Sequence, residues 1–78
     1  MSLYFFHIHD SAGVVPDDDG MMLPDLEAAR REAILSIREI LAQVEFRLSD
    51  EYSYIAIADD RGATIMRVPF REGLILSS

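Results

Sequence analysis

The sequence contains no cysteine and no lysine among its 78 residues. Without cysteine, the chain can form no disulfide, offers no thiolate to a metal and has no thiol nucleophile. Without lysine, it has no amine that could form a Schiff base or act as an amine base. Arginine supplies all 7 basic residues, against 14 acidic ones, for a net charge of -7. Such a charge repels phosphate groups, so we expect no binding to nucleic acid or to an anionic membrane, whereas a basic protein partner is compatible with it.

Long hydrophobic runs are also missing. No run approaches the roughly 20 apolar residues that span a bilayer, and no basic segment precedes an apolar one at the start of the chain. We therefore expect a soluble, cytoplasmic protein. Because 50% of the residues are hydrophobic, a chain of this length can bury one small core, and we expect residues 1–78 to form a single domain.

Two β-hairpins are predicted, one near each end of the chain. The aromatic and β-branched residues 4–9 are typical of a strand, and Val14-Val15, ended by Pro16, predict a short partner. Residues 52–58 and 64–68 predict a second pair of strands. The turn between them is Asp59-Asp60-Arg61-Gly62, with glycine where a left-handed residue is favoured.

Between the hairpins, the sequence predicts one long amphipathic helix. Apolar residues recur at spacings of three and four from Leu26 to Leu48, and Asp25 is a favourable N-cap. We expect the helix to run from about residue 26 to about residue 47. Residues 21–23 before it are expected to be extended or irregular, and the sequence does not place the tail, residues 71–78.

The order hairpin, helix, hairpin predicts an α+β fold of two layers, β-β-α-β-β. One long helix would pack on one face of a small, mostly antiparallel four-stranded sheet. The strand order 2-1-3-4 makes every neighbouring pair antiparallel. In this arrangement the alternate residues Tyr4, Phe6 and Ile8 face the helix, and their neighbours lie on the outer face of the sheet.

Three stretches resemble a known family. They are "YFFHIHD", "VPDDDG" and "LPDLEAARREA", and they are similar to the YFFH-x-x-D, PD-x-x-G and LPDLEAAR motifs of a small bacterial domain of unknown function. Val68-Pro69-Phe70 matches the same family more loosely. The resemblance implies a small fold of helix and strands and carries no activity, cofactor or site residue. A looser similarity of the helix pattern to antitoxin proteins would make the chain an acidic partner of a basic protein.

The histidines raise the question of a metal site. His7 and His9 are two residues apart on a predicted strand and so project to the same side, as two zinc ligands would. A zinc site needs three or four ligands, there is no third histidine, and Asp10 lies on the opposite face. We interpret the two histidines as ordinary side chains of the outer face. A metal site that a second copy completes across a dimer interface remains the alternative.

The aspartate run of residues 17–19 suggests calcium, but the spacing fails. If Gly20 held the glycine position of an EF-hand loop, the first and twelfth positions would be Val15 and Leu26, which cannot ligate calcium. We interpret the run as a solvated turn, separate from the histidines.

The outer face of the sheet is open to two interpretations, an interaction surface or a half-polar exposed face with scattered apolar residues, which antiparallel sheets tolerate. Interfaces favour Tyr, Phe and Arg, and a sheet left open on one side is often covered by a second copy. No nucleophile elbow or phosphate-binding loop is present, so we expect no catalytic residue and no cofactor. Our leading hypothesis is a non-catalytic interaction module, a homodimer through this face or an edge strand. The predicted partner-binding residues are Phe5, His7, His9, Tyr54, Ile65 and Arg67, with Ala56 and Ala58 between them.

Overall fold

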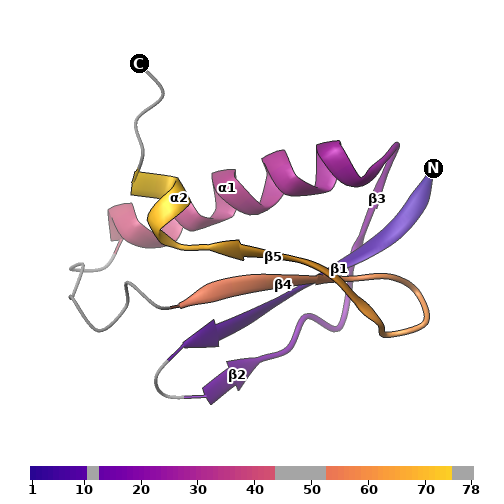
Figure 1. The fold of residues 1–78 in the computed structure, drawn as a ribbon, viewed down its shortest axis with the longest axis horizontal. Helices are drawn as coiled ribbons and strands as arrows, with labels where there is room; N and C mark the ends of the chain where they lie inside the picture. Colours follow the sequence, from indigo (N-terminus) through magenta and orange to yellow (C-terminus); the bar gives the residue numbers. More distant parts are fainter. Residues whose placement is uncertain (11–12, 44–52, 75–78) are drawn as a thin grey trace.

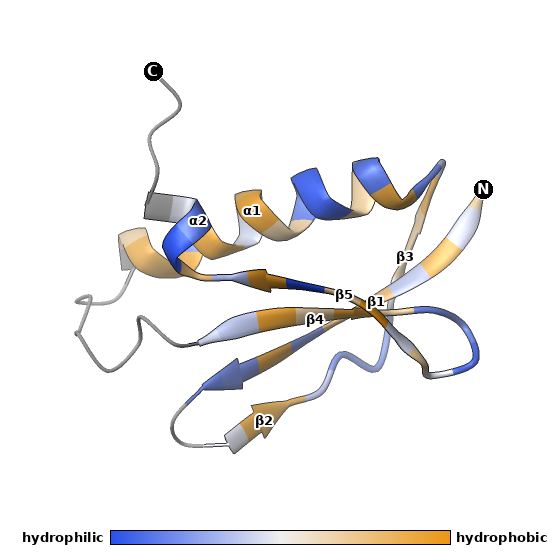
Figure 2. Cartoon of the chain, viewed as in Figure 1, coloured by the Kyte–Doolittle hydropathy of each residue, from blue (hydrophilic) through white to orange (hydrophobic). Residues whose placement is uncertain are grey.

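The computed structural model describes residues 1–10, 13–43 and 53–74. It confirms the α+β class, with an antiparallel sheet and one long helix (Figure 1). Hydrophilic residues gather at the turn between the last two strands, and hydrophobic ones line the strands before and after it (Figure 2). The elements are β1 (Ser2–Asp10), β2 (Gly13–Val15), β3 (Met21–Leu23), α1 (Leu26–Gln43), β4 (Tyr54–Ala58), β5 (Thr64–Pro69) and α2 (Arg71–Leu74).

The sheet has the strand order β2-β1-β4-β5, and each neighbouring pair is antiparallel. This is the order that we predicted for the two hairpins. The segment Met21–Leu23, expected to be extended or irregular, is a third short strand, β3, which pairs with Ser2–Tyr4 of β1. The edge of β1 that faces away from β4 is therefore paired by β2 at one end and by β3 at the other.

The core lies between α1 and one face of the sheet. Tyr4 is buried, Phe6 and Ile8 pack against the same cluster, and the predicted inner face of β1 is thereby confirmed. Small side chains at Ala29 and Ala33 let the helix approach the strands closely. Burying one Ile or Val side chain stabilises the fold by about 1.5–3 kcal/mol, so these contacts fix α1 to this face. The largest fully buried side chains are Ile37, Ile55, Ile57 and Val68.

Helix α1 begins as the sequence predicts. The Oδ1 atom of Asp25 accepts a hydrogen bond of 2.8 Å from the amide of Ala28, and its carbonyl accepts one of 3.2 Å from Ala29. This N-cap satisfies an amide that the first turn leaves without a partner. The last four residues of the predicted helix, 44–47, lie outside the described part of the chain.

The short helix α2 was not predicted, and it packs against α1 (Figure 1). Gly73 makes the contact possible, because a Cβ atom at this position would meet Cγ2 of Ile37 at 2.5 Å. An ion pair of 2.9 Å between Arg30 and Glu72 also joins the two helices. Neither described helix has the length and apolar character that crossing a membrane requires.

Candidate functional site on the outer face of the sheet

The outer face of the sheet, turned away from α1, is built from rows of side chains that cross the strands. Directly opposed residues of an antiparallel pair point to the same face, so the strand register fixes each row. Within the described residues, no helix covers this face. The first row is Val14, His9, Tyr54 and Pro69, the second is His7, Ala56 and Arg67, and the third is Phe5, Ala58 and Thr64.

Aromatic and cationic side chains stack along these rows. The rings of His9 and Tyr54 lie 4.6 Å apart and 9° from parallel, and Cζ of Arg67 lies 5.7 Å from the centre of the Tyr54 ring. Cation–π contacts of this kind contribute about 0.5–1 kcal/mol at exposed sites. The rings of Phe5 and His7 are also stacked, with centres 6.3 Å apart. The predicted aromatic residues are thus brought together on one surface.

The small residues of β4 lie beneath these rings. Ala56 is 2% exposed and Ala58 is 0% exposed, although both are on the face that no described helix covers. Their cross-strand neighbours, His7 and Arg67 beside Ala56 and Phe5 beside Ala58, flank them. The accessible part of this face therefore consists of the flanking side chains, with the buried alanines between them.

Asp17 connects the loop after β2 to the centre of β1. Its Oδ2 atom accepts a hydrogen bond of 3.1 Å from the amide of Phe6, and Oδ1 accepts bonds from the amides of Asp19 (3.1 Å) and Gly20 (3.3 Å). Its own amide donates to Nδ1 of His7 at 3.0 Å. Between β2 and β3, the edge of β1 has no strand partner among the described residues. There the carboxylate of Asp17 accepts the hydrogen bond from Phe6 that a neighbouring strand would otherwise accept.

The hydrogen bond from Asp17 to His7 joins the aspartate run to the histidines and fixes the tautomer of His7. We had placed the aspartate run in a turn separate from the histidines, and this was wrong: β2 is so short that the chain returns along β1 and brings Asp17 to His7. Because Nδ1 of His7 accepts a hydrogen bond, the proton of the neutral ring is on Nε2. That assignment leaves Nε2 as the atom of His7 that can contact another group.

The pKa of Asp17 is perturbed by this environment. Partial burial alone would raise it, but the hydrogen bonds from Phe6, Gly20 and Asp19, together with the electrostatic influence of His7, outweigh that effect. The pKa of the carboxyl group therefore lies below its ordinary value. Hydrogen bonds to the charged form have this effect because they are lost on protonation.

The electrostatic character of the outer face changes from one edge to the other. Asp17 lies beside His7 at one end of the second row, and Arg67 stands at the other end, across Ala56. The acidic end also holds a hollow of about 300 Å³, lined by Phe5, His7, Asp17, Asp18, Asp59, Asp60 and Gly62. Among the residues that the structure describes, no group of three or more His, Cys, Asp or Glu side chains is arranged to hold a metal ion.

Ile65 lies outside the cross-strand rows of the outer face. The pairing of β4 with β5 shifts between Ile57 and Ala58, so that Met66 and Thr64 are paired and Ile65 between them has no cross-strand partner. It lines one pocket with Tyr4 of the inner face and another along β5 with Arg67. The sequence prediction assumed a regular strand here and could not place this β-bulge.

Two contributors to the outer face were missing from the sequence prediction. Val14 is 54% exposed and pairs with His9, a register that the small number of residues between Asp10 and Val14 in the sequence could have indicated. Asp18 lies in the acidic hollow beside His7. Nothing local in the sequence signals its position, because it depends on the contact between Asp17 and β1.

The fold and the site together define a small two-layer α+β domain with one open, mixed aromatic and charged sheet face. The chain belongs to the family described as "Domain of unknown function (DUF6894)", whose sequence model matches residues 3–71. No curated protein matches the chain, and no solved structure does.

Proposed function

We propose that this chain is a non-catalytic interaction module that forms a homodimer through the outer face of its sheet. The observation that carries the proposal is the charged row on that face, which has Asp17 and Asp18 at one end, His7 and Ala56 between, and Arg67 at the other end. A surface with opposite charges at its two ends is complementary to itself after a half-turn.

The geometry of such a dimer follows from the strand order. If a two-fold axis runs along β4 within the interface, β5 of one copy lies over β1 of the other. Arg67 of each copy then lies over the ring of His7 and can pair with the carboxylate of Asp18 in the second copy, and this contact occurs twice. Because Ala56 and Ala58 have short side chains, the two sheets can approach each other closely at the centre of the interface. Tyr54 and Phe5 supply the aromatic area that interfaces favour.

Light scattering of the purified chain tests the dimer. We expect a mass of two copies at high micromolar concentration, and a mass of one copy for Tyr54→Glu, because this substitution places a charge at the centre of the interface. Circular dichroism checks that the variant keeps its fold. A wild-type chain that stays monomeric throughout this range contradicts the proposal.

A charge-swap experiment tests the specific contact. Arg67→Glu and Asp18→Arg should each weaken the dimer, and an equimolar mixture of the two variants should restore it, because Glu at 67 then meets Arg at 18. Arg38→Glu is the matched control, since Arg38 is exposed on α1 and its reversal should leave the dimer unchanged. If each variant dimerises as well as the wild type, the outer face is not the interface and an edge strand takes its place.

The metal alternative requires a different dimer, with the two-fold axis along β1, which would bring His7 and His9 of two copies together. A metal on Nε2 of His7 would also move the ring proton to Nδ1, at the expense of the hydrogen bond from the amide of Asp17. Elemental analysis of protein purified without chelator, compared with the His7→Ala and His9→Ala double variant, separates the two functions. We expect equal and negligible metal in both samples. Zinc that is bound by the wild type and lost in the double variant would favour the metal site.

A further inference from the structure

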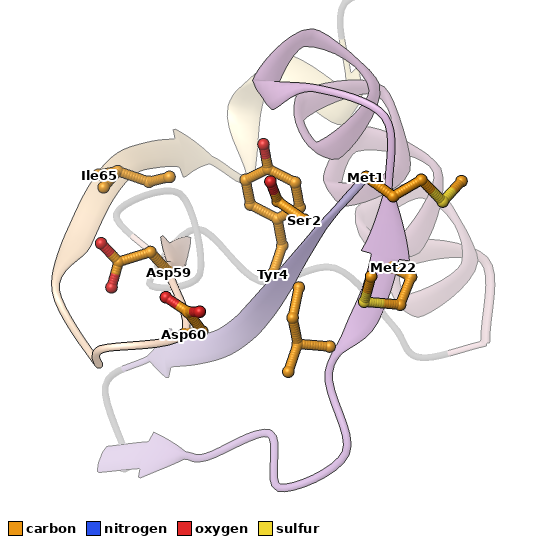
Figure 3. A pocket seen from close by; sticks show the side chains of 8 residues that line it. Met1, Ser2, Tyr4, Met22, Asp59, Asp60 and Ile65 are labelled. Atoms are coloured by element: carbon orange, nitrogen blue, oxygen red, sulfur yellow. The ribbon is translucent and has the colours of Figure 1, made fainter.

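A second surface, at the N-terminal end of β1, has the features of a peptide-binding site. We propose that it docks an extended, basic peptide segment of a partner protein, which adds to the open edge of β1 in line with β4. We call this surface the notch. Its residues are Met1, Ser2, Leu3, Tyr4, Met22, Asp59, Asp60 and Ile65, and they enclose about 490 Å³ (Figure 3). The inference does not depend on the proposed dimer.

The first observation is an unpaired strand edge. Strand β4 ends opposite Phe5, so residues 2–4 of β1 are paired on one edge only, by β3. Successive residues of a strand direct their amide and carbonyl groups to alternate edges. The amide of Phe6 is directed to the edge of β2 and β3, where it meets Asp17. Leu3 precedes Phe6 by three residues, an odd number, so its amide and carbonyl are directed to the opposite edge of β1, which faces the notch.

The second observation is exposed apolar surface around that edge. The β-bulge leaves Ile65 without a cross-strand partner and 41% exposed. On the other side of β1, Met22 is 53% exposed. Figure 3 shows Ile65 and Met22 on opposite sides of the β1 ribbon, with Tyr4 between them. A strand edge flanked by apolar side chains is the arrangement that peptides use when they add to a sheet.

The third observation is the charge at the end of the notch. Oδ1 of Asp59 accepts hydrogen bonds of 2.9 Å from the amides of Arg61 and Ala63, so this carboxylate holds the turn. Asp60 is exposed, and its carboxylate makes no hydrogen bond or ion pair with the described residues. It is therefore available to a cation on a ligand.

These charges decide which occupant fits. A second copy of the chain docked here would bring its own Asp59 and Asp60 to the same place, so like charges would meet at the notch. A basic segment is attracted instead. Its main chain would pair with Leu3, an apolar side chain would contact Ile65, and an arginine or lysine would meet Asp60.

Nuclear magnetic resonance of the whole chain with a synthetic peptide tests the inference. The probe is Arg-Val-Arg-Val-Arg, and its acidic counterpart Glu-Val-Glu-Val-Glu is the control peptide. We expect the basic peptide to shift the amide resonances of Leu3, Tyr4 and Ile65 at up to millimolar concentration, and the acidic one to shift none of them. A version of the basic peptide with methylated backbone nitrogens should bind more weakly, because it lacks the amide donors.

A pair of matched variants completes the test. Asp60→Lys should weaken binding of the basic peptide about tenfold, since it replaces an attraction by a repulsion. Asp19→Lys makes the same change of charge on an exposed residue outside the notch and should weaken it much less. Absence of binding at millimolar peptide, equal loss in both variants, or shifts that map to another surface would each overturn the proposal.

Discussion

Replacing Asp17 by asparagine removes a charge and one acceptor without changing the shape of the side chain. In the native chain, Oδ2 accepts from the amide of Phe6, and Oδ1 accepts from those of Asp19 and Gly20. An asparagine keeps a single oxygen, so its NH2 group must face one of these amide donors. Either β1 or the loop therefore loses its hydrogen bond to residue 17.

The size of the effect can be worked from these contacts. A hydrogen bond to a charged group contributes about 1.5–3 kcal/mol, and a buried amide left without a partner costs about 1–3 kcal/mol. The bond to Phe6 is only partly buried, so water can replace it in part, and we expect Asp17→Asn to lower the free energy of unfolding by about 1–2 kcal/mol. A domain of this size is stabilised by about 5 kcal/mol in total, so the loss should be easy to detect.

Urea denaturation followed by circular dichroism measures this loss, with Asp18→Asn as the matched control. Asp18 is exposed in the same turn, and its substitution removes the same charge, so we expect a change within about 0.5 kcal/mol. If Asp17→Asn destabilises the chain no more than Asp18→Asn does, the carboxylate of Asp17 does not hold the loop to β1.

Three further predictions concern pH, a glycine and the helix N-cap. The pKa of Asp17 is lowered in the folded chain, so the stabilisation by its carboxylate is present above the unfolded pKa of about 3.9 and is lost as the pH falls through the lower folded pKa. The melting temperatures of the wild type and of Asp17→Asn should therefore converge as the pH falls through this range, which thermal unfolding measures. Gly20→Ala should destabilise more than Gly62→Ala in urea denaturation, because both residues have positive φ but only at Gly20 would a Cβ meet other atoms within 3.1 Å; equal losses would contradict the packing of the loop on β1. Asp25→Ala should reduce the free energy of unfolding by about 1 kcal/mol, and no change would argue against its role as N-cap.

The elements that the sequence predicts correctly are those with a local signal. A run of aromatic and β-branched residues marks β1, and Asp25 followed by apolar residues at helical spacing marks the start of α1. The order of the strands then follows, because an antiparallel sheet with a right-handed crossover allows few arrangements.

The features that the sequence could not predict depend on contacts between distant residues. Strand β3 has only three residues and exists because it pairs with Ser2–Tyr4. The position of α2 depends on the absence of a side chain at Gly73, opposite Ile37. The hydrogen bonds of Asp17 to β1 likewise join residues ten or more positions apart. Patterns of hydropathy within one segment contain no information about such pairs.

In the proposed dimer, a second copy of the chain covers the outer face of the sheet. Nuclear Overhauser effects between isotope-labelled and unlabelled copies in a mixed sample measure these contacts directly. We predict intermolecular effects that join Tyr54 and Arg67 of one copy to side chains of β1 in the other. Intermolecular effects confined to the exposed side of α1, or none in a sample at millimolar concentration, would contradict the proposed dimer.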